Sequence, residues 1–470
     1  MLGVNKRIIW VASCALGVVL AGCSWAPKHY SPDTAELDIP EYWQSSQRGE
    51  PQSLDTLLSK QAGQLDLLSL LPSLNLESKL DPLFSANPSF QRRLYQLLEQ
   101  RALQGQSEAA LLPSLNITAD RDRTASAGQK ASSQHSLRLS SSWELDVWGR
   151  LSDQLQAAEF DSQALALEIE YAKRSLLSDV IQQALFLSNG RLALELEERR
   201  LASALKNEQL IHRRYRAGLG SLRDLNVAQT ESYQRRAATE VLRESQLNYQ
   251  RDLQRLFADF EMPTFAENTW QDVKFPEISM PATVLAQRPD LQAAFKKIKA
   301  ADLRSEYSYK QLLPSFTINA NLFNSQLKTA DLLSSDPSWN LLGQLSQSLF
   351  QGGRIKSEIK AAEARAAQAY WSYKEALLGA FFEVDSALSK EASLAKQEQA
   401  LKASLRYAQQ SHIDVEQRYQ RGLSSIFDVL SAQRTSFDLQ AQLLQLQLDR
   451  ASNRLNLALV MGLPIKATTI

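Results

Sequence analysis

The chain of 470 residues lacks several features that mark common classes of protein. Lysine plus arginine and aspartate plus glutamate each number 52, so the net charge is zero. The basic excess that nucleic-acid-binding proteins use is therefore absent, and we expect no nucleic-acid partner. Beyond the N-terminus no run approaches about 18 apolar residues, which excludes a bundle of transmembrane helices. Transmembrane strands are not excluded, because their alternating pattern is a much weaker signal.

Cysteine and recognisable catalytic motifs are also scarce. The only cysteines are Cys14 and Cys23, and Cys14 lies in an apolar segment of signal-peptide length that is removed from the mature chain. One remaining cysteine cannot form an intrachain disulfide. The four histidines have no ligand-like spacing, and there is no nucleophile elbow, phosphate loop or HExxH sequence. We therefore predict no enzyme activity, no metal site and no cofactor.

The N-terminus carries a candidate lipidation signal. Lys6 and Arg7 precede the apolar segment, and the sequence Leu-Ala-Gly-Cys at 20–23 resembles a bacterial lipobox. This pattern predicts a lipoprotein signal peptide over residues 1–22 and a lipid on Cys23, although a chance cysteine beside an ordinary cleavage site is the alternative. Ser24, rather than aspartate, implies sorting to the outer membrane. Residues 23–86 contain six prolines and are expected to form an extended anchor and leader segment.

Two long stretches contain no proline, residues 114–262 and 338–463. Because proline inside a helix costs about 3 kcal/mol, such stretches favour long helices. Apolar residues recur three and four positions apart from Ile355 to Ala387, and a similar seam rich in alanine and serine runs from Leu151 to Ile169. These patterns predict two helical hairpins, one over 150–217 and 223–260 and the other over 354–420 and 426–461.

The chain repeats itself over about 200 residues. RYRAGLGSLRDLNVAQ at 214–229 returns as RYQRGLSSIFDVLSAQ at 418–433, and LLPSLNI at 111–117 returns as LLPSFTI at 312–318. A duplication of this length indicates two intertwined halves with one topology. We assign residues 87–270 and 271–470 as structural repeats, each with a short helix, a pair of strands and a long helical hairpin.

Alternating apolar and polar residues predict the strands. They lie at 114–122 and 136–147 in the first repeat and at 315–323 and 341–350 in the second. Four strands cannot close a lipid-exposed barrel, and a bilayer does not tolerate open sheet edges, so strands that enter the membrane must come from several chains. Trp143 and Trp339 are expected at a membrane interface, whereas Trp148 is expected in the core.

Together, these motifs resemble one family. The lipobox, the doubled LLPS strand starts, the SWELDVWGR and QGGR strand-to-helix junctions and the doubled RYxxGxxSxxDxxxAQ turn look like outer-membrane efflux proteins of the OprM–TolC type, in the lipoprotein branch of the RND-type efflux channels. The resemblance covers about residues 85–465. One departure is the leader, which lacks the tryptophan-rich stretch expected ahead of the first helix.

The resemblance implies an α/β membrane channel. A homotrimer would form a twelve-stranded transmembrane β-barrel, with four strands per chain, continuous with a long periplasmic α-helical barrel. It implies a place in the outer membrane of a Gram-negative bacterium, lipid-anchored and extending into the periplasm. The implied partners are outer-membrane lipid, a periplasmic adaptor (membrane fusion) protein and an inner-membrane RND-type pump, for which the channel is a passive export duct.

The candidate site residues lie at the two hairpin turns. Asp224 and Asp428 are equivalent in the repeat, and the resemblance implies that they line the periplasmic aperture. Each also follows a serine by three positions, as in a helix capping box, and the two roles are compatible. The resemblance further implies that the adaptor contacts the hairpin tips, at Gly218, Leu219, Gly422, Leu423 and Ser424.

Two other functions remain open on the sequence. The outer channel of a type I protein secretion system is the alternative within transport. A lipid-anchored coiled-coil structural protein without a pore is an alternative of a different class.

Overall fold

The computed structural model describes residues 40, 42–44, 67–68, 76–125, 128, 131–260, 273, 275, 281–332 and 334–465. Cys23 and most of the leader lie outside the described residues, so the predicted lipidation site is not placed by the structure.

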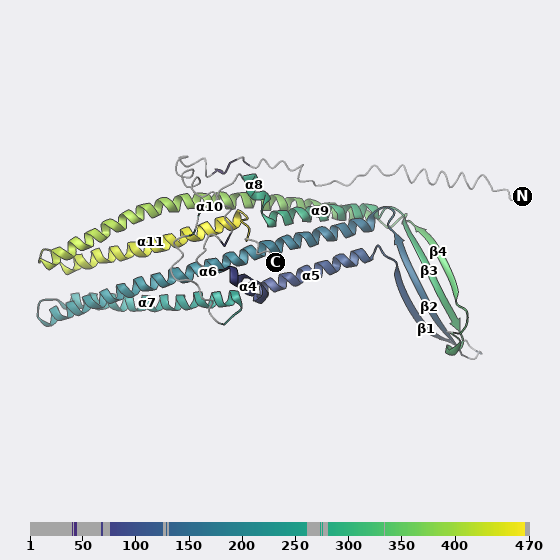
Figure 1. Cartoon of the computed structure of the whole chain (residues 1–470), viewed down its shortest axis with the longest axis horizontal. Coiled ribbons are helices and arrows are strands. Elements are labelled where there is room, and N and C mark those ends of the chain that lie inside the picture. Colours follow the sequence, from purple (N-terminus) through teal and green to yellow (C-terminus); the bar gives the residue numbers. More distant parts are fainter. Residues whose placement is uncertain are drawn as a thin grey trace. The chain divides into compact units, whose positions relative to one another are not determined.

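The order of elements repeats along the chain (Figure 1). The first half contains a 3-10 helix, η3 (Glu77–Lys79), then α4 (Leu80–Ala86), α5 (Pro88–Ala109), β1 (Ser114–Thr124), β2 (Ser132–Leu145), α6 (Arg150–Arg216) and α7 (Leu222–Phe257). The second half contains α8 (Pro281–Ala286), α9 (Pro289–Lys310), β3 (Ser315–Gln326), η5 (Thr329–Leu332), β4 (Ser338–Ser346), α10 (Arg354–Gln420) and α11 (Ile426–Val460). The predicted helix, strand pair and helical hairpin occur in both halves.

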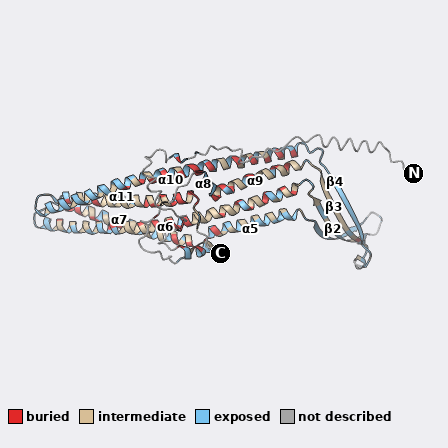
Figure 2. Ribbon diagram, turned by 45° about the horizontal axis from the view of Figure 1, so that its top comes forward, coloured by how far each residue is buried: buried red, intermediate tan, exposed pale blue. Residues whose placement is uncertain are grey.

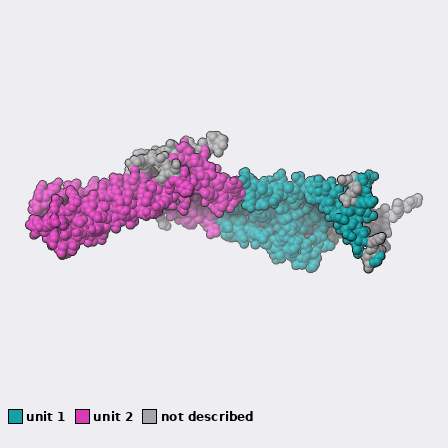
Figure 3. Space-filling view, turned by 90° about the horizontal axis from the view of Figure 1, so that it is seen from below, with its two compact units in different colours: residues 1–36, 98–164, 294–374 teal, residues 37–97, 165–293, 375–470 magenta. Residues whose placement is uncertain are grey.

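Tertiary contacts divide the chain into two compact units, and each draws on both repeats (Figure 3). One unit comprises residues 1–36, 98–164 and 294–374 and contains the four-stranded sheet. The other comprises residues 37–97, 165–293 and 375–470 and contains both hairpin turns. The repeats are therefore intertwined, because equivalent segments of the two halves pack in the same unit.

The four strands form one antiparallel sheet in the order β1-β2-β3-β4. The sequence predicted two separate strand pairs, and in the structure β2 also pairs with β3, which joins them. The β2–β3 pairing runs from His135 opposite Gln326 to Leu145 opposite Phe316. Consequently β1 and β4 each have a single partner within the chain and carry one open edge. All nine residues of β4 are exposed, as are all eleven of β1 (Figure 2).

The last strand starts and ends earlier than predicted. The expected range was 341–350, but β4 spans Ser338–Ser346, with Ser346 opposite Ser315 at the first position of β3. The residue before Ser315 is Pro314, which has no N–H group to continue the ladder. The alternating apolar pattern continued to Phe350, but the length of the partner strand sets the length of β4.

Three tryptophans lie on or beside the sheet. Trp143 is 38% exposed and Trp339 is 75% exposed, and their position at a membrane interface stays a prediction. Trp148 was predicted in the core, and this is wrong, because it is 43% exposed. Its indole Nε1 donates to the carbonyl of Pro314 (2.7 Å), and its ring lies 6.4 Å from the ring of Phe316, at an interplanar angle of 43°.

The long helices match their predicted ranges closely. α6 and α10 each contain 67 residues, and the apolar seam residues Ile359, Ala366 and Val384 are almost fully buried. Gly149 (φ +71°) and Gly353 (φ +89°) precede α6 and α10 with left-handed backbone that favours glycine. Among the described residues, no helix has the length and apolarity needed to cross a membrane.

The leader contributes more to the core than the sequence indicated. Leu67 and Leu83 are at most 1% exposed and pack in a cluster with Leu177, Leu253 and Leu455 of α6, α7 and α11. The Leu67 N–H also donates to the carbonyl of Pro464 (3.1 Å). Earlier in the leader, Trp43 is 3% exposed and stacks on Phe381 of α10 at 5.1 Å. The predicted extended leader therefore supplies core residues at several points.

Candidate functional site

The two hairpin turns are closed by the same backbone motif. After α6, the N–H of Gly218 donates to the carbonyl of Tyr215 (3.0 Å), and the N–H of Leu219 donates to the carbonyl of Arg214 (2.9 Å). After α10, the N–H of Gly422 donates to the carbonyl of Tyr419 (2.9 Å), and the N–H of Leu423 donates to the carbonyl of Arg418 (2.8 Å). This pair of bonds is the Schellman motif, which needs a left-handed residue after the helix.

Glycine supplies that conformation in both turns. Gly218 has φ +72° and Gly422 has φ +75°, and nothing lies within 4 Å of a Cβ built on either residue. The two glycines are therefore required by the backbone and not by crowding. The tips they form leave Leu219 71% exposed and Leu423 75% exposed.

The two aspartates cap the helices that return from the tips. Ser221 and Asp224 form a reciprocal capping box at the start of α7, with both side-chain-to-backbone distances at 3.2 Å. Ser425 and Asp428 do the same at the start of α11, at 3.2 and 2.8 Å. The capping role expected from the sequence is thus confirmed, while the aperture role stays a prediction.

Asp428 has additional hydrogen-bond donors. The hydroxyls of Ser425 (2.8 Å) and Ser424 (2.9 Å) both donate to its Oδ2. Hydrogen bonds from the Ser425 side chain, the Ser425 backbone and the Ser424 side chain lower the pKa of Asp428. The carboxylate therefore stays ionised at neutral pH. Ser424 was predicted to contact the adaptor at the tip, and in the structure its hydroxyl binds Asp428.

The two hairpins contact each other just above the tips. Ile211, Leu225 and Ala228 of the first hairpin are buried and pack against Ile426 and Leu430 of the second. Polar groups add to this contact. Arg214 donates to the hydroxyl of Tyr419 (3.0 Å), and Asn207 donates to Gln433 (3.3 Å).

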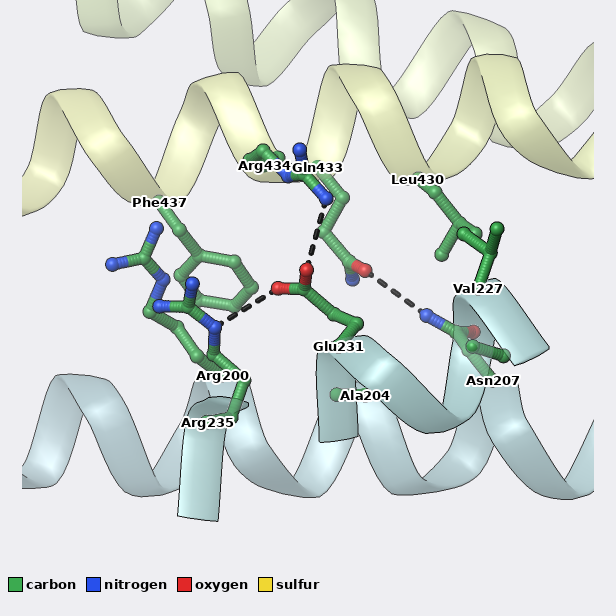
Figure 4. Close-up of a pocket in the computed structure, with 11 residues that line it drawn as sticks. Arg200, Ala204, Asn207, Val227, Glu231, Arg235, Leu430, Gln433, Arg434 and Phe437 are labelled. Carbon is green, nitrogen blue, oxygen red and sulfur yellow. Dashed lines mark hydrogen bonds and ion pairs between the residues drawn. The ribbon is translucent and has the colours of Figure 1, made fainter. Parts of the chain in front are cut away.

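A chain of ion pairs continues the contact away from the tips (Figure 4). Glu231 of α7 binds Arg434 of α11 (2.9 Å) and Arg235 of its own helix (2.9 Å). Arg235 also binds Glu197 of α6 (3.1 Å), whose side chain is 8% exposed. Arg200 of α6 pairs with Glu197 and with Asp438 of α11, so the hairpins are joined at two points.

These charges border a small cavity of about 70 Å³ that also has apolar walls, including Val227, Leu430 and Phe437. A cavity of this size is far smaller than the several hundred Å³ of typical ligand sites, so we interpret the network as a structural link between the hairpins. None of these ion pairs was predicted from the sequence, although the spacing of four between Glu231 and Arg235 is typical of an ion pair within one helix. No signal in the sequence placed Arg434 or Asp438 opposite them.

Comparison with known proteins assigns the fold to a family. The family model for outer membrane efflux protein matches residues 82–258 and 280–463, one match in each half of the chain. The chain belongs to the outer membrane efflux protein family. Membership confirms the resemblance seen in the sequence, the outer-membrane location and the efflux function, and the four antiparallel strands agree with the fold class.

Several members of the family resemble this chain over most of its length. Outer membrane protein OprJ of Pseudomonas aeruginosa is 25% identical over 446 residues, covering 92% of this chain and 91% of OprJ. The cation efflux system protein CusC of Escherichia coli K12 is 24% identical over 462 residues, covering 95% and 97%. These relatives are efflux and outer-membrane proteins by name and not enzymes.

Solved structures share the fold. A crystal structure of CusC superposes with a TM-score of 0.82 at 20% identity, covering 94% of this chain and 100% of that one. The open state of the Neisseria gonorrhoeae MtrE outer membrane channel gives 0.81 at 22% identity, covering 95% and 100%. Among the described residues, no group of three or more histidine, cysteine, aspartate or glutamate side chains is arranged to hold a metal ion.

Proposed function

We propose that this member of the outer membrane efflux protein family is the outer-membrane duct of a tripartite export system. It would be a passive, non-catalytic channel that a periplasmic adaptor and an inner-membrane RND-type pump engage. The observation that carries the proposal is a four-stranded sheet with open edges at β1 and β4, in a chain that also exposes two apolar hairpin tips. Open edges in a membrane require further copies of the chain to complete a closed barrel.

Three copies would give twelve strands, a number that closes a barrel with room for a passage. Single-channel recording in planar bilayers tests the duct. We expect discrete conductance steps from the purified protein. A folded, inserted protein that conducts no ions would contradict the proposal and favour a purely structural coiled-coil role.

The oligomeric state gives a second test. We expect a trimer in mild detergent, because each chain leaves the outer edges of β1 and β4 unpaired and a monomer would expose both edges to lipid. Mass measurement of the detergent-solubilised protein, with the detergent contribution subtracted, checks this. A stable monomer would remove the pore model.

Lipid attachment to Cys23 is part of the same proposal. We expect Cys23→Ser to abolish acylation and processing by the lipoprotein signal peptidase, because the thiol is the acyl acceptor. Metabolic labelling with a palmitate analogue measures this, and Cys14→Ser is the matched control, since Cys14 lies within the predicted signal. Label retained on the Cys23 variant would overturn the lipobox assignment.

We also propose that Asp224 and Asp428 of three chains line the periplasmic aperture. Six carboxylates at one constriction attract cations, so Asp224→Asn with Asp428→Asn should shift the reversal potential under a salt gradient away from cation selectivity and weaken block by divalent cations. The aspartates are the N3 residues of their capping boxes, where an asparagine oxygen can also accept from the serine N–H but carries no charge. We therefore expect only a small loss of thermal stability, at most about 1 kcal/mol per site.

Selectivity has to be compared between wild type and the double variant, because the arginines at the first tip carry charge of the opposite sign in both proteins. Identical selectivity of the two proteins would leave capping as the only role of the aspartates.

A further inference from the structure

The two hairpin tips differ in charge, although their backbones are the same. Residues 213–224 of the first tip contain four arginines and one aspartate. The repeat-equivalent residues 417–428 contain two arginines and one aspartate. Arg213 and Arg216 correspond to Gln417 and Gln420, and Arg223 corresponds to Phe427. The first tip is therefore distinctly basic, and the second is not.

The extra arginines have no partner within the described part of the chain. Arg213, Arg216 and Arg223 are all exposed, and their side chains make no ion pair or hydrogen bond with another described residue. By contrast, Arg214 donates to Tyr419 and Arg418 binds Asp414 at 3.0 Å, so within residues 417–428 Arg421 alone has a guanidinium without a described partner. The one aspartate of the first tip, Asp224, is engaged in its capping box. Three guanidinium groups are thus available to another molecule.

Local structure does not account for these arginines. Arg213 and Arg216 lie in the last turn of α6, where cations are favourable, but α10 ends in the same Schellman motif with glutamines at those positions. Arg223 lies in the first turn of α7, at the positive end of the helix dipole, where a cation is unfavourable. An unpaired arginine at this position lowers the stability of the hairpin slightly. A contact between Arg223 and another molecule would account for its presence.

Apolar side chains lie beside the unpaired arginines. Leu219 is 71% exposed and Leu222 is 56% exposed. Leu222 and Arg223 begin a shallow groove of about 510 Å³ that continues along α7 past Val227 and Thr230. Its lining includes Glu231, whose charge is neutralised by Arg434 at 2.9 Å. A phosphate or sugar polymer would match the arginines but not the leucines. An amphipathic helix with acidic residues beside its apolar stripe matches both.

We propose that the first hairpin tip binds an acidic amphipathic helix of the periplasmic adaptor, and that the second tip discriminates far less by charge. This inference rests on the proposed function and adds to it the chemistry of the partner. Guanidinium groups bind carboxylates in bidentate geometry, and the exposed leucines cover the partner's apolar stripe. The two tips of each chain would then differ in their role in docking.

The test uses the purified full-length channel in detergent and two helical peptides of about 24 residues, long enough to hold a helix when bound. Both peptides carry the same leucine stripe, one with glutamate and the other with lysine on the polar face. We expect wild type to bind the glutamate peptide roughly tenfold more tightly than the lysine peptide, equivalent to about 1.4 kcal/mol.

The repeat supplies matched variants that are compatible with the fold. Arg213→Gln with Arg216→Gln gives the end of α6 the residues that end α10 and should weaken the preference for glutamate, with Arg223 still in place. Gln417→Arg with Gln420→Arg makes the reverse exchange at the end of α10 and should add affinity for the glutamate peptide at the second tip. Equal binding of both peptides to wild type, or an unchanged preference in the Arg213→Gln, Arg216→Gln variant, would overturn the inference.

Other occupants give distinct results. Binding of phosphatidylglycerol vesicles that is lost in the Arg213→Gln, Arg216→Gln variant, without peptide binding, would assign the arginines to a membrane. Loss of the trimer in that variant, read by mass measurement, would assign them to a second copy of the chain. Both results overturn the proposal. The proposed function is tested separately: if deleting the gene leaves fluorescent-dye accumulation in cells unchanged, the export role fails, whatever the peptides do.

Discussion

Replacing Leu219 and Leu423 together with aspartate is expected to abolish export in cells, to the level of a strain without the channel. Both leucines are more than 70% exposed at hairpin tips and fill no core of their own chain. A carboxylate at either position would lose its water on contact with a docking partner, at a cost of several kcal/mol. Dye accumulation in intact cells measures export.

The control for this experiment is Leu327→Asp, because Leu327 is also 72% exposed but lies in the connection after β3, far along the chain from either tip. Expression, trimer mass and bilayer conductance should be the same in wild type, in the tip variant and in the control. Unchanged export by the tip variant would show that the leucines are not docking residues. Loss of conductance as well as export would indicate a folding defect.

The second large effect concerns the second hairpin. Replacing Arg450 with methionine should lower the free energy of unfolding by about 2–3 kcal/mol, because two buried carboxylates each lose one of their two cationic partners. Arg450 of α11 binds Glu391 (2.9 Å) and Glu398 (2.6 Å) of α10, and the side chains of these glutamates are 5% and 10% exposed. Arg454 still reaches Glu391 at 2.8 Å and Lys402 still reaches Glu398 at 2.7 Å, so each carboxylate keeps one cationic partner.

Thermal unfolding followed by circular dichroism measures the effect, and Arg251→Met is the matched control. Arg251 binds Glu244 at 2.9 Å, but both side chains are about 60% exposed, and such surface pairs contribute at most about 1 kcal/mol. A loss of stability in the Arg450 variant no larger than in the Arg251 variant would contradict the assignment of a buried ionic link.

The same link predicts a pH dependence. Burial alone would raise the pKa of Glu398, but hydrogen bonds from Lys402, Arg450 and Gln447 outweigh it and lower the pKa to about 2. The depressed pKa stabilises the folded protein at pH values above the ordinary glutamate pKa of about 4.3. This stabilisation is lost as the pH falls from that value towards about 2. After allowance for solvent screening, the contribution is on the order of 2 kcal/mol.

In the Arg450→Met variant the pKa of Glu398 is depressed less, so the acid-induced loss of stability should be smaller and should end at a higher pH. Melting temperatures measured across this range would show it, and coincident pH profiles of wild type and variant would exclude a role for Glu398.

The amino-acid sequence predicted the long helices and the tips well, for local reasons. Proline-free stretches, the three-and-four spacing of apolar residues and the glycine after each hairpin helix depend only on neighbouring residues, so α6, α7, α10 and α11 lie close to their expected ranges. Capping by Asp224 and Asp428 was likewise readable, because donor and acceptor are three residues apart. The motifs at the turns and junctions also identified the family.

Other features depended on contacts between residues distant in the chain. The alternating pattern of β4 extended to Phe350, but pairing with β3 ended the strand at Ser346. The exposure of Trp148 followed from a hydrogen bond to Pro314, more than 160 positions away. The leader looked irregular, yet Leu67 is fully buried because α6, α7 and α11 present an apolar surface that needs covering.

By itself, then, the sequence determined the helical hairpins, their capped turns, the number of strands and the need for more than one chain, because each of these follows from local backbone preference or from counting. Only the tertiary structure decided that β2 pairs with β3 and that Glu231 and Arg200 join the two hairpins through Arg434 and Asp438. It also showed that three arginines of the first tip have no partner among the described residues. Those outcomes depend on which surfaces meet in space, and side chains some 200 residues apart carry no local pattern that records their meeting.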